Sequence, residues 1–198
     1  MNILTGYSPL IERALRTVLR LHEGRFRKTD PSVSAVSHLF HTALIVCAHG
    51  FPEHVIAAAL LHDTLEDTEY PAERLASEFG PEILSIVKAV SERKDLPWKE
   101  RKRTYLESVS RASYEAKAVS AADKIHNLST ILEAHAERGE EIWNVFAGSR
   151  EGTIDFYTDA YHAIAEGWDH PLVCEYRSIL ERAKGTFGRG DERKLSPP

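Results

Sequence analysis

The stretch from Ala57 to Thr68 reads AAALLHDTLEDT and places an imidazole and three carboxylates after five apolar residues. An apolar run of this kind predicts a buried helix, here over residues 55–65. His62 and Asp63 follow the run directly, and burying an imidazole and a carboxylate without partners costs several kcal/mol. They therefore need a partner, and a metal ion is the partner that both residue types bind. Offsets of three and four place Glu66 and Asp67 beside them, one helical turn further along.

Two more candidate ligands lie outside this stretch. Asp123 follows the mainly apolar run at 118–121, and His38 begins the apolar stripe of a helix over residues 39–47. The full candidate set offers two imidazoles and two carboxylates: His38, His62, Asp63 and Asp123. Such a mixture of nitrogen and oxygen ligands suits a divalent first-row metal ion and leaves positions open for water and substrate. The set therefore predicts a hydrolytic metal site.

Each piece alone has an ordinary structural explanation. An adjacent His-Asp pair occurs by chance in many proteins, and Glu66 with Asp67 alone indicates a solvated helix end. The order of the pieces, each preceded by apolar residues, favours the metal site.

Apolar residues recur at helical spacing through almost the whole sequence, and no segment shows the alternation of a strand. The predicted helices cover residues 11–19, 39–47, 55–65, 71–79, 82–92, 99–109, 115–137, 140–146, 152–165 and 171–183. We therefore predict an all-α fold in a single compact domain over residues 1–184, with the metal-site core at about 20–135 and C-terminal helices at about 140–184. The polar segment 24–34 is expected to be a loop, and 185–198 a flexible tail.

The composition excludes several classes of protein. The 198 residues are 42% hydrophobic, and 25 Lys and Arg against 30 Asp and Glu give a net charge of -5, which argues against a DNA- or RNA-binding protein. Cys47 and Cys174 are too few for a disulfide framework or a cysteine-based zinc site. No apolar run approaches the roughly 20 residues of a membrane span, and no signal peptide is expected. We therefore expect a cytoplasmic protein without a membrane partner.

The motifs together resemble the HD-domain phosphohydrolases, and within them the small stand-alone hydrolases of the RelA/SpoT-type alarmone branch. The matching segments are FRK at 26–28, the His38 segment, AALLHDTLEDT at 58–68, FGPEILSIVKAV at 79–90, ERKR at 100–103 and SAADKIHNLSTI at 120–131. They cover most of residues 20–135. The resemblance implies the HD-domain fold, with His38, His62, Asp63 and Asp123 as ligands of a metal ion that is usually manganese in this branch.

The same resemblance implies roles for the polar residues around the metal. Glu66 and Asp67 match the acidic pair that positions and deprotonates the attacking water. Arg27 and Lys28 match the basic pair that meets the nucleotide, and Asn127 matches the asparagine near the ribose or base. The implied reaction removes the 3′-pyrophosphate from guanosine tetra- or pentaphosphate. The sequence after the SAADKIHNLSTI motif is too short for a synthetase half, so we expect hydrolysis only.

The segment before the first predicted ligand departs from the family pattern. The branch usually has Pro-Tyr-Ile before this histidine and Pro after it, whereas residues 33–39 read VSAVSHL. Two alternatives therefore stay open. One is an HD phosphohydrolase acting on another nucleotide or a phosphorylated cofactor, and the other is a non-catalytic nucleotide-binding regulator. The expected partner is a small nucleotide, and the oligomeric state, including a homodimer, is left open.

Basic side chains are expected around the acidic site, because phosphoryl transfer depends on position and charge. Lys124 follows a predicted ligand directly, and Lys102 is a further candidate. The C-terminal aromatic residues are expected mainly in the core, although Tyr157 or Arg150 is a candidate for closing one side of the pocket. Solvated surface positions are expected for two other arginines, Arg101 and Arg103.

Two of the ten histidines are predicted ligands. His126 follows Asp123 by three residues and is expected beside the site or in packing. His41 is expected to be buried and satisfied by the backbone. The others, His22 among them, are expected at the surface or at the ends of helices.

Overall fold

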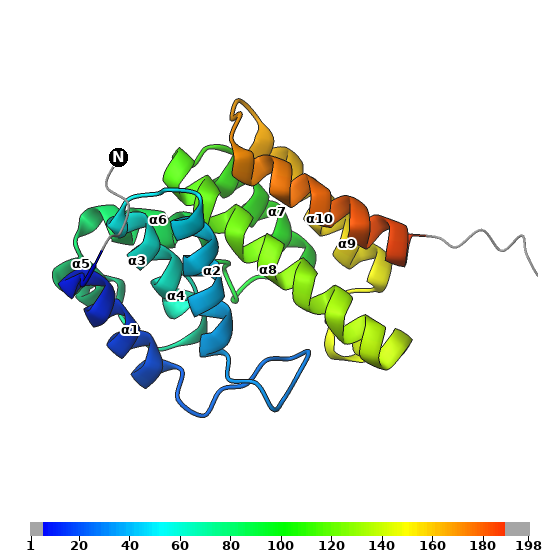
Figure 1. Ribbon diagram of the computed structural model, residues 1–198, viewed down its shortest axis with the longest axis horizontal. Helices are drawn as coiled ribbons and strands as arrows, with labels where there is room; N and C mark the ends of the chain where they lie inside the picture. Colours follow the sequence, from blue (N-terminus) through cyan, green and yellow to red (C-terminus); the bar gives the residue numbers. More distant parts are fainter. Residues whose placement is uncertain (1–5, 189–198) are drawn as a thin grey trace, which may run out of the picture.

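A computed structural model describes residues 6–188 of the chain, and Figure 1 shows them as packed helices without a sheet. The elements are α1 Pro9–Leu21, α2 Val36–Ala48, α3 Glu53–Leu61, α4 Thr64–Asp67, α5 Ala72–Phe79, α6 Pro81–Val90, α7 Trp98–Ser110, α8 Tyr114–Arg138, the 3-10 helix η1 Gly139–Val145, α9 Arg150–Ala165 and α10 Pro171–Phe187. Between residues 6 and 188, the only extended pairing is an isolated bridge between Phe26 and Ser34. The all-α prediction is confirmed.

The long helix α8 runs through the middle of the molecule (Figure 1). It joins two hydrophobic clusters. One cluster is built mainly from α1, α2, α3, α5 and α6, and the other mainly from α7, α9 and α10. On α8, Val119 and Ala122 pack into the first cluster, whereas Ala121 and Ile125 pack into the second. Asp123 comes between these residues, so the helix places it where the two clusters meet.

Serine caps and a glycine define the ends of two helices. The Ser8 hydroxyl accepts the N–H of Ile11 at 3.1 Å at the start of α1, and the Ser113 hydroxyl accepts the N–H of Ala116 at 3.3 Å at the start of α8. The helix α8 ends at Arg138 and is capped by Gly139, whose φ of 60° lies in the left-handed region that favours glycine. These local signals fix the ends of the central helix.

The single helix predicted over 55–65 is wrong, because the chain turns within the HDTLEDT motif. Helix α3 ends at Leu61, and α4 begins at Thr64. At the break, Nδ1 of His62 donates to the carbonyl oxygen of Ala59 at 2.7 Å, so the side chain uses an acceptor from the last turn of α3. The N–H of Asp67 still donates to the carbonyl of Asp63 at 2.8 Å, so the predicted one-turn spacing of the carboxylates survives the break.

Two C-terminal boundaries also differ from the prediction. The segment predicted as a helix over 140–146 is the 3-10 helix η1. The last helix continues through Gly185 to Phe187, beyond the predicted tail boundary, because Phe187 is buried and its ring packs edge-on to Trp143 at 5.1 Å. The rest of the predicted tail, residues 189–198, lies outside the described residues, and the domain boundary at 184 stays a prediction.

The prediction of a loop over residues 24–34 agrees with the structure. The segment has no helix, and its two arms are joined where the N–H of Arg27 donates to the carbonyl of Val33 at 2.8 Å. Among the helices of residues 6–188, none has the length and apolar character needed to cross a membrane.

Candidate metal centre

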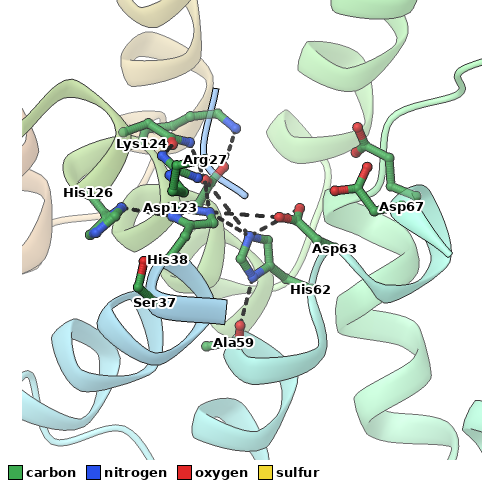
Figure 2. Close-up of polar contacts among 12 residues, drawn as sticks. Arg27, Ser37, His38, Ala59, His62, Asp63, Asp67, Asp123, Lys124 and His126 are labelled. Carbon is green, nitrogen blue, oxygen red and sulfur yellow. Dashed lines mark hydrogen bonds and ion pairs between the residues drawn. The ribbon is translucent and has the colours of Figure 1, made fainter. Parts of the chain in front are cut away.

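His38, His62 and Asp123 bring their ligand atoms together between α2, the end of α3 and the middle of α8 (Figure 2). Nε2 of His38 lies 3.2 Å from Nε2 of His62 and 3.1 Å from Oδ1 of Asp123. Nε2 of His62 lies 3.9 Å from the same Asp123 oxygen. Three residues separated by up to 85 positions therefore converge on one point, as their chemistry predicted.

Asp63 faces the same point from the turn between α3 and α4. Its Oδ1 lies 3.2 Å from Nε2 of His62, and its Oδ2 lies 3.8 Å from Nε2 of His38. The Asp63 side chain is 28% exposed, whereas His38 and His62 are each 3% exposed. The fourth candidate ligand thus closes the solvent side of the cluster.

The spacing of these atoms fits a divalent cation. Metal bonds to imidazole and carboxylate ligands are about 2.0–2.2 Å long, so two ligands at right angles lie about 3 Å apart and two opposite ligands about 4.2 Å apart. The measured separations, from 3.1 Å to 3.9 Å, fall within these limits. The two carboxylates also supply two negative charges, which balance the charge of a divalent ion, while neutral imidazoles add none. The residues present therefore fit a divalent metal ion.

The carboxylate of Asp123 is held in its charged form although it is buried. Burial opposes the charge, but the adjacent ammonium of Lys124 and then the hydrogen bond with His38 outweigh it, so the pKa of Asp123 lies well below its usual range. Lys124 is itself buried and forms an ion pair with Oδ2 of Asp123. The other oxygen, Oδ1, faces the two histidines, so the carboxylate has one oxygen for Lys124 and one for the metal position.

A chain of hydrogen bonds joins the polar loop to this carboxylate. Arg27 donates from Nη2 to Oδ1 of Asn127 at 2.8 Å, and Asn127 donates from Nδ2 to Oδ1 of Asp123 at 2.5 Å. The same Arg27 nitrogen lies 3.4 Å from the hydroxyl of Thr130. The predicted substrate-binding residues Arg27 and Asn127 thus contact each other, and Asn127 also contacts the candidate metal ligand Asp123.

His126 lies beside the cluster, as its spacing from Asp123 predicted. Its Nδ1 is 2.8 Å from Nδ1 of His38, on the edge of that ring away from His62 (Figure 2). Burial, followed by the neighbouring His38 and Arg27, lowers the pKa of His126 to about 3, so its ring is neutral. His126 is therefore an uncharged neighbour of a candidate ligand.

An acidic wall flanks the candidate metal position. Oε2 of Glu66 accepts the backbone N–H of Glu92 at 3.0 Å, and Asp67 forms an ion pair with Lys94. Burial, and then the charge of Asp63, raises the pKa of Glu66 to about 7. A carboxyl group with such a pKa can take up and release a proton near neutral pH.

A pocket of about 640 Å³ opens over this wall and over three of the candidate ligands, His38, Asp63 and Asp123. Its basic side includes Lys102, whose ammonium lies 2.5 Å from Oε1 of Glu92 and 4.0 Å from the centre of the Phe156 ring. Lys28 lies exposed at its edge, and Tyr157 forms part of the far wall. The pocket therefore combines the acidic wall, basic side chains and aromatic side chains, and its volume is within the size range of small-molecule sites.

Several residues differ from their sequence-based interpretation. Arg101 was expected at the surface, but it lines the pocket, where its Nε lies 2.9 Å from Oε2 of Glu92. Sequence spacing does not indicate this ion pair, because Glu92 lies outside the helix that contains Arg101. Arg103 is exposed, as predicted. Arg150 forms ion pairs with Glu140 and Glu151, while Tyr157 takes the predicted place at the pocket.

The prediction that His41 is buried is wrong. His41 is exposed, not buried, although its ring lies 4.8 Å from that of His126. His22 lies at a helix end, as predicted. It is nevertheless 2% exposed and lines the pocket, and its Nε2 has no hydrogen-bond partner in the described part of the chain. The position of His22, at the end of α1 and just before the basic loop, is the only sequence signal that could have drawn attention to it.

The comparisons with known proteins agree with this geometry. A family model described as "HD domain" matches residues 14–154. The chain belongs to the HD-domain family. Among curated relatives, the HD-domain chain is 34% identical over 140 residues to guanosine-3′,5′-bis(diphosphate) 3′-pyrophosphohydrolase MESH1 of Xenopus tropicalis, covering 70% of this chain and 78% of the relative. The human protein of the same name is 36% identical over 111 residues, which cover 55% of this chain and 62% of the relative.

Solved structures resemble the whole HD-domain fold. A metazoan ortholog of SpoT, described as hydrolysing ppGpp, superimposes with a TM-score of 0.77 at 25% identity, covering 90% of this chain and 97% of that one. The lmo0812 protein of Listeria monocytogenes gives a TM-score of 0.68 at 29% identity, covering 77% of this chain and 94% of that one. The predicted HD-domain fold is confirmed.

Proposed function

We propose that this protein is a metal-dependent hydrolase that removes the 3′-pyrophosphate from guanosine tetra- and pentaphosphate. Water attacks the 3′-linked phosphorus, the bond to the ribose 3′ oxygen breaks, and the products are guanosine 5′-di- or triphosphate and pyrophosphate. The observation that carries the proposal is the convergence of His38, His62, Asp63 and Asp123 beside a pocket with an acidic and a basic side. The names of the MESH1 relatives and the SpoT-like structure support this choice of substrate.

The four ligands would hold a divalent ion, for which we propose Mn²⁺. When bound, the ion supplies a Lewis acid that activates water and polarises a phosphoryl oxygen. The imidazoles stay neutral as ligands, while Asp63 and Asp123 offset the charge of the ion. Lys124 holds one oxygen of Asp123, which leaves the other directed at the metal position.

Glu66 and Asp67 act on the attacking water in this proposal. Glu66 accepts its proton, which agrees with a pKa raised to about 7 by burial and the charge of Asp63. Asp67 lies one residue further on α4, forms an ion pair with Lys94, and orients the water. Replacement of either acid should therefore reduce turnover more than substrate binding.

The basic side chains bind the anionic substrate. Arg27 and Lys28 extend from the loop before α2, Lys124 from α8, and all three line the pocket with Asn127. Positive charges at fixed positions stabilise the negative charge that moves during phosphoryl transfer. The aromatic wall that contains Phe156 and Tyr157 gives the nucleoside an apolar surface. A cytoplasmic location and the absence of a nucleic-acid partner remain predictions from the sequence, and the oligomeric state stays open.

A substrate panel tests the proposal. The Mn²⁺-loaded protein is incubated with ppGpp, pppGpp, GTP, GDP and a set of phosphorylated cofactors, and nucleotides, pyrophosphate and phosphate are separated by ion-exchange chromatography. We expect ppGpp to give GDP and pyrophosphate in equal amounts, and GTP and GDP to remain intact. The Asp63→Asn variant, prepared in parallel, should give no products.

Other results would select the alternatives. Turnover of another nucleotide or cofactor, with ppGpp untouched, would contradict the alarmone substrate and favour a different HD phosphohydrolase, which the VSAVSHL segment at 33–39 also motivates. Tight ppGpp binding with neither turnover nor metal uptake would favour a regulator.

A further inference from the structure

In each of the two candidate imidazole ligands, the two ring nitrogens make different contacts. In His38, Nε2 faces His62 and Asp123, whereas Nδ1 lies 2.8 Å from Nδ1 of His126. In His62, Nε2 faces the same cluster, whereas Nδ1 donates to the carbonyl oxygen of Ala59 at 2.7 Å. Each ring therefore presents Nε2 to the metal position and uses Nδ1 for a contact behind it (Figure 2).

The proton positions follow from these contacts. A neutral imidazole carries one proton, and the nitrogen that binds a metal must keep its lone pair. Metal binding through Nε2 of His38 therefore places the proton on Nδ1, where it can only donate. The facing Nδ1 of His126 must then accept, so the proton of His126 lies on its own Nε2.

The two ligands differ in what fixes this arrangement. A backbone carbonyl can only accept a hydrogen bond, so the carbonyl of Ala59 fixes the tautomer of His62 whatever the side chains around it. For His38, the acceptor is the side chain of His126, which is buried and lies one turn after Asp123 on α8. Helix α8 thus supplies both a candidate ligand and the group that orients another ligand.

We propose that His126 is a positioning residue that holds His38 with its proton on Nδ1 and its Nε2 lone pair directed at the metal. It touches neither the metal nor the substrate, and it raises the affinity for the cation by removing the alternative tautomer and ring orientation. This inference rests on the metal site of the proposed function.

Metal affinity measures this role separately from turnover. Mn²⁺ is titrated into metal-free protein by isothermal calorimetry at one fixed pH, for the wild type and two substitutions of His126. The His126→Ala variant removes the acceptor, and we expect its Kd for Mn²⁺ to rise about 10- to 100-fold, the usual loss when such a partner of a metal-binding histidine is removed. The His126→Asn variant places an amide oxygen near the position of Nδ1 and should recover most of the affinity.

Two further variants separate orientation from packing. His126→Gln has a similar size, but its amide lies nearer the position of Nε2, so it should bind Mn²⁺ as weakly as the alanine variant. His41→Ala removes the exposed ring that lies against His126 and leaves the contact with His38 intact, so its Kd should equal that of the wild type. Long-range ¹H–¹⁵N spectra of the Zn²⁺-loaded protein should show the proton of His38 on Nδ1.

The outcomes distinguish failure of this role from failure of the metal site. If the wild type binds Mn²⁺ and the alanine or glutamine variant binds it equally well, His126 does not position His38, and the metal site stands. If the alanine variant does not fold, the comparison of asparagine with glutamine decides, and equal affinities overturn the inference. If the wild type binds no divalent metal, the proposed function itself fails.

Discussion

Replacing Glu66 by glutamine should stabilise the metal-free protein at alkaline pH. Glu66 lies in the acidic wall, where its side chain is 20% exposed and accepts the backbone N–H of Glu92. Glutamine keeps an oxygen for that hydrogen bond and removes the charge. Burial, and then the neighbouring Asp63, raises the pKa of Glu66 from 4.5 to about 7, so the folded protein resists ionisation of this group.

The size of the effect follows from this shift. Between pH 4.5 and about 7 the folded state binds a proton that the unfolded state releases, so stability falls as the pH rises through this window. At about 1.36 kcal/mol per pKa unit, the full shift corresponds to about 3 kcal/mol. Since the glutamine side chain cannot ionise, the Glu66→Gln variant avoids this loss. Its advantage in unfolding free energy should be under about 1 kcal/mol at pH 5 and reach about 3 kcal/mol at pH 8.

Urea unfolding followed by circular dichroism, at pH 5 and pH 8 with a chelator present, measures this difference. The chelator is needed because a bound cation would favour the carboxylate. Glu69→Gln is the matched control, because Glu69 is exposed and the change removes one charge without altering the buried wall. An advantage for Glu66→Gln that is equal at both pH values, or larger at pH 5, would refute the burial argument.

Three other substitutions test separate parts of the site. Asp67→Asn should lower kcat for ppGpp by about 10²- to 10⁴-fold, measured in stopped assays, with little change in the Kd for Mn²⁺, measured by calorimetry. An unchanged kcat would show that Asp67 does not act on the attacking water. Arg27→Met should raise KM more than it lowers kcat, and the KM of this variant should depend less on salt than that of the wild type; an unchanged KM would place the substrate elsewhere. Lys124→Met should destabilise the metal-free protein by about 3–5 kcal/mol in urea unfolding, because Asp123 loses its buried countercharge. Mn²⁺ should restore part of that loss, and no response to the ion would argue against Asp123 as a ligand.

Local sequence patterns predict the helices of this protein well because most of them have one apolar face and clear end signals. The exceptions have identifiable causes. The helix predicted through His62 breaks there because the imidazole takes a backbone acceptor of its own last turn, a contact that apolar spacing does not encode. The final helix extends past Gly185 because Phe187 finds a buried place beside Trp143, which depends on the tertiary fold.

The candidate ligands could be identified from sequence because buried His and Asp residues need partners. The helices that carry these candidate ligands also reach the junction of the two hydrophobic clusters. The surrounding polar residues were harder to predict. Glu92 was expected inside a helix, yet it follows the end of α6 and contacts Glu66, Arg101 and Lys102 from distant segments. His22 carries no spacing signal at all, since only the packing of α1 brings it to the pocket.

Stepwise addition of Mn²⁺ to the metal-free protein, with release of pyrophosphate from ppGpp measured at each step, tests the central claim most directly. We expect no turnover without metal, a linear increase up to one equivalent of Mn²⁺ per chain, and a plateau beyond it. Full activity in the presence of a strong chelator, or activity that does not respond to added metal, would contradict the assignment of His38, His62, Asp63 and Asp123 as the ligands of a hydrolytic metal ion.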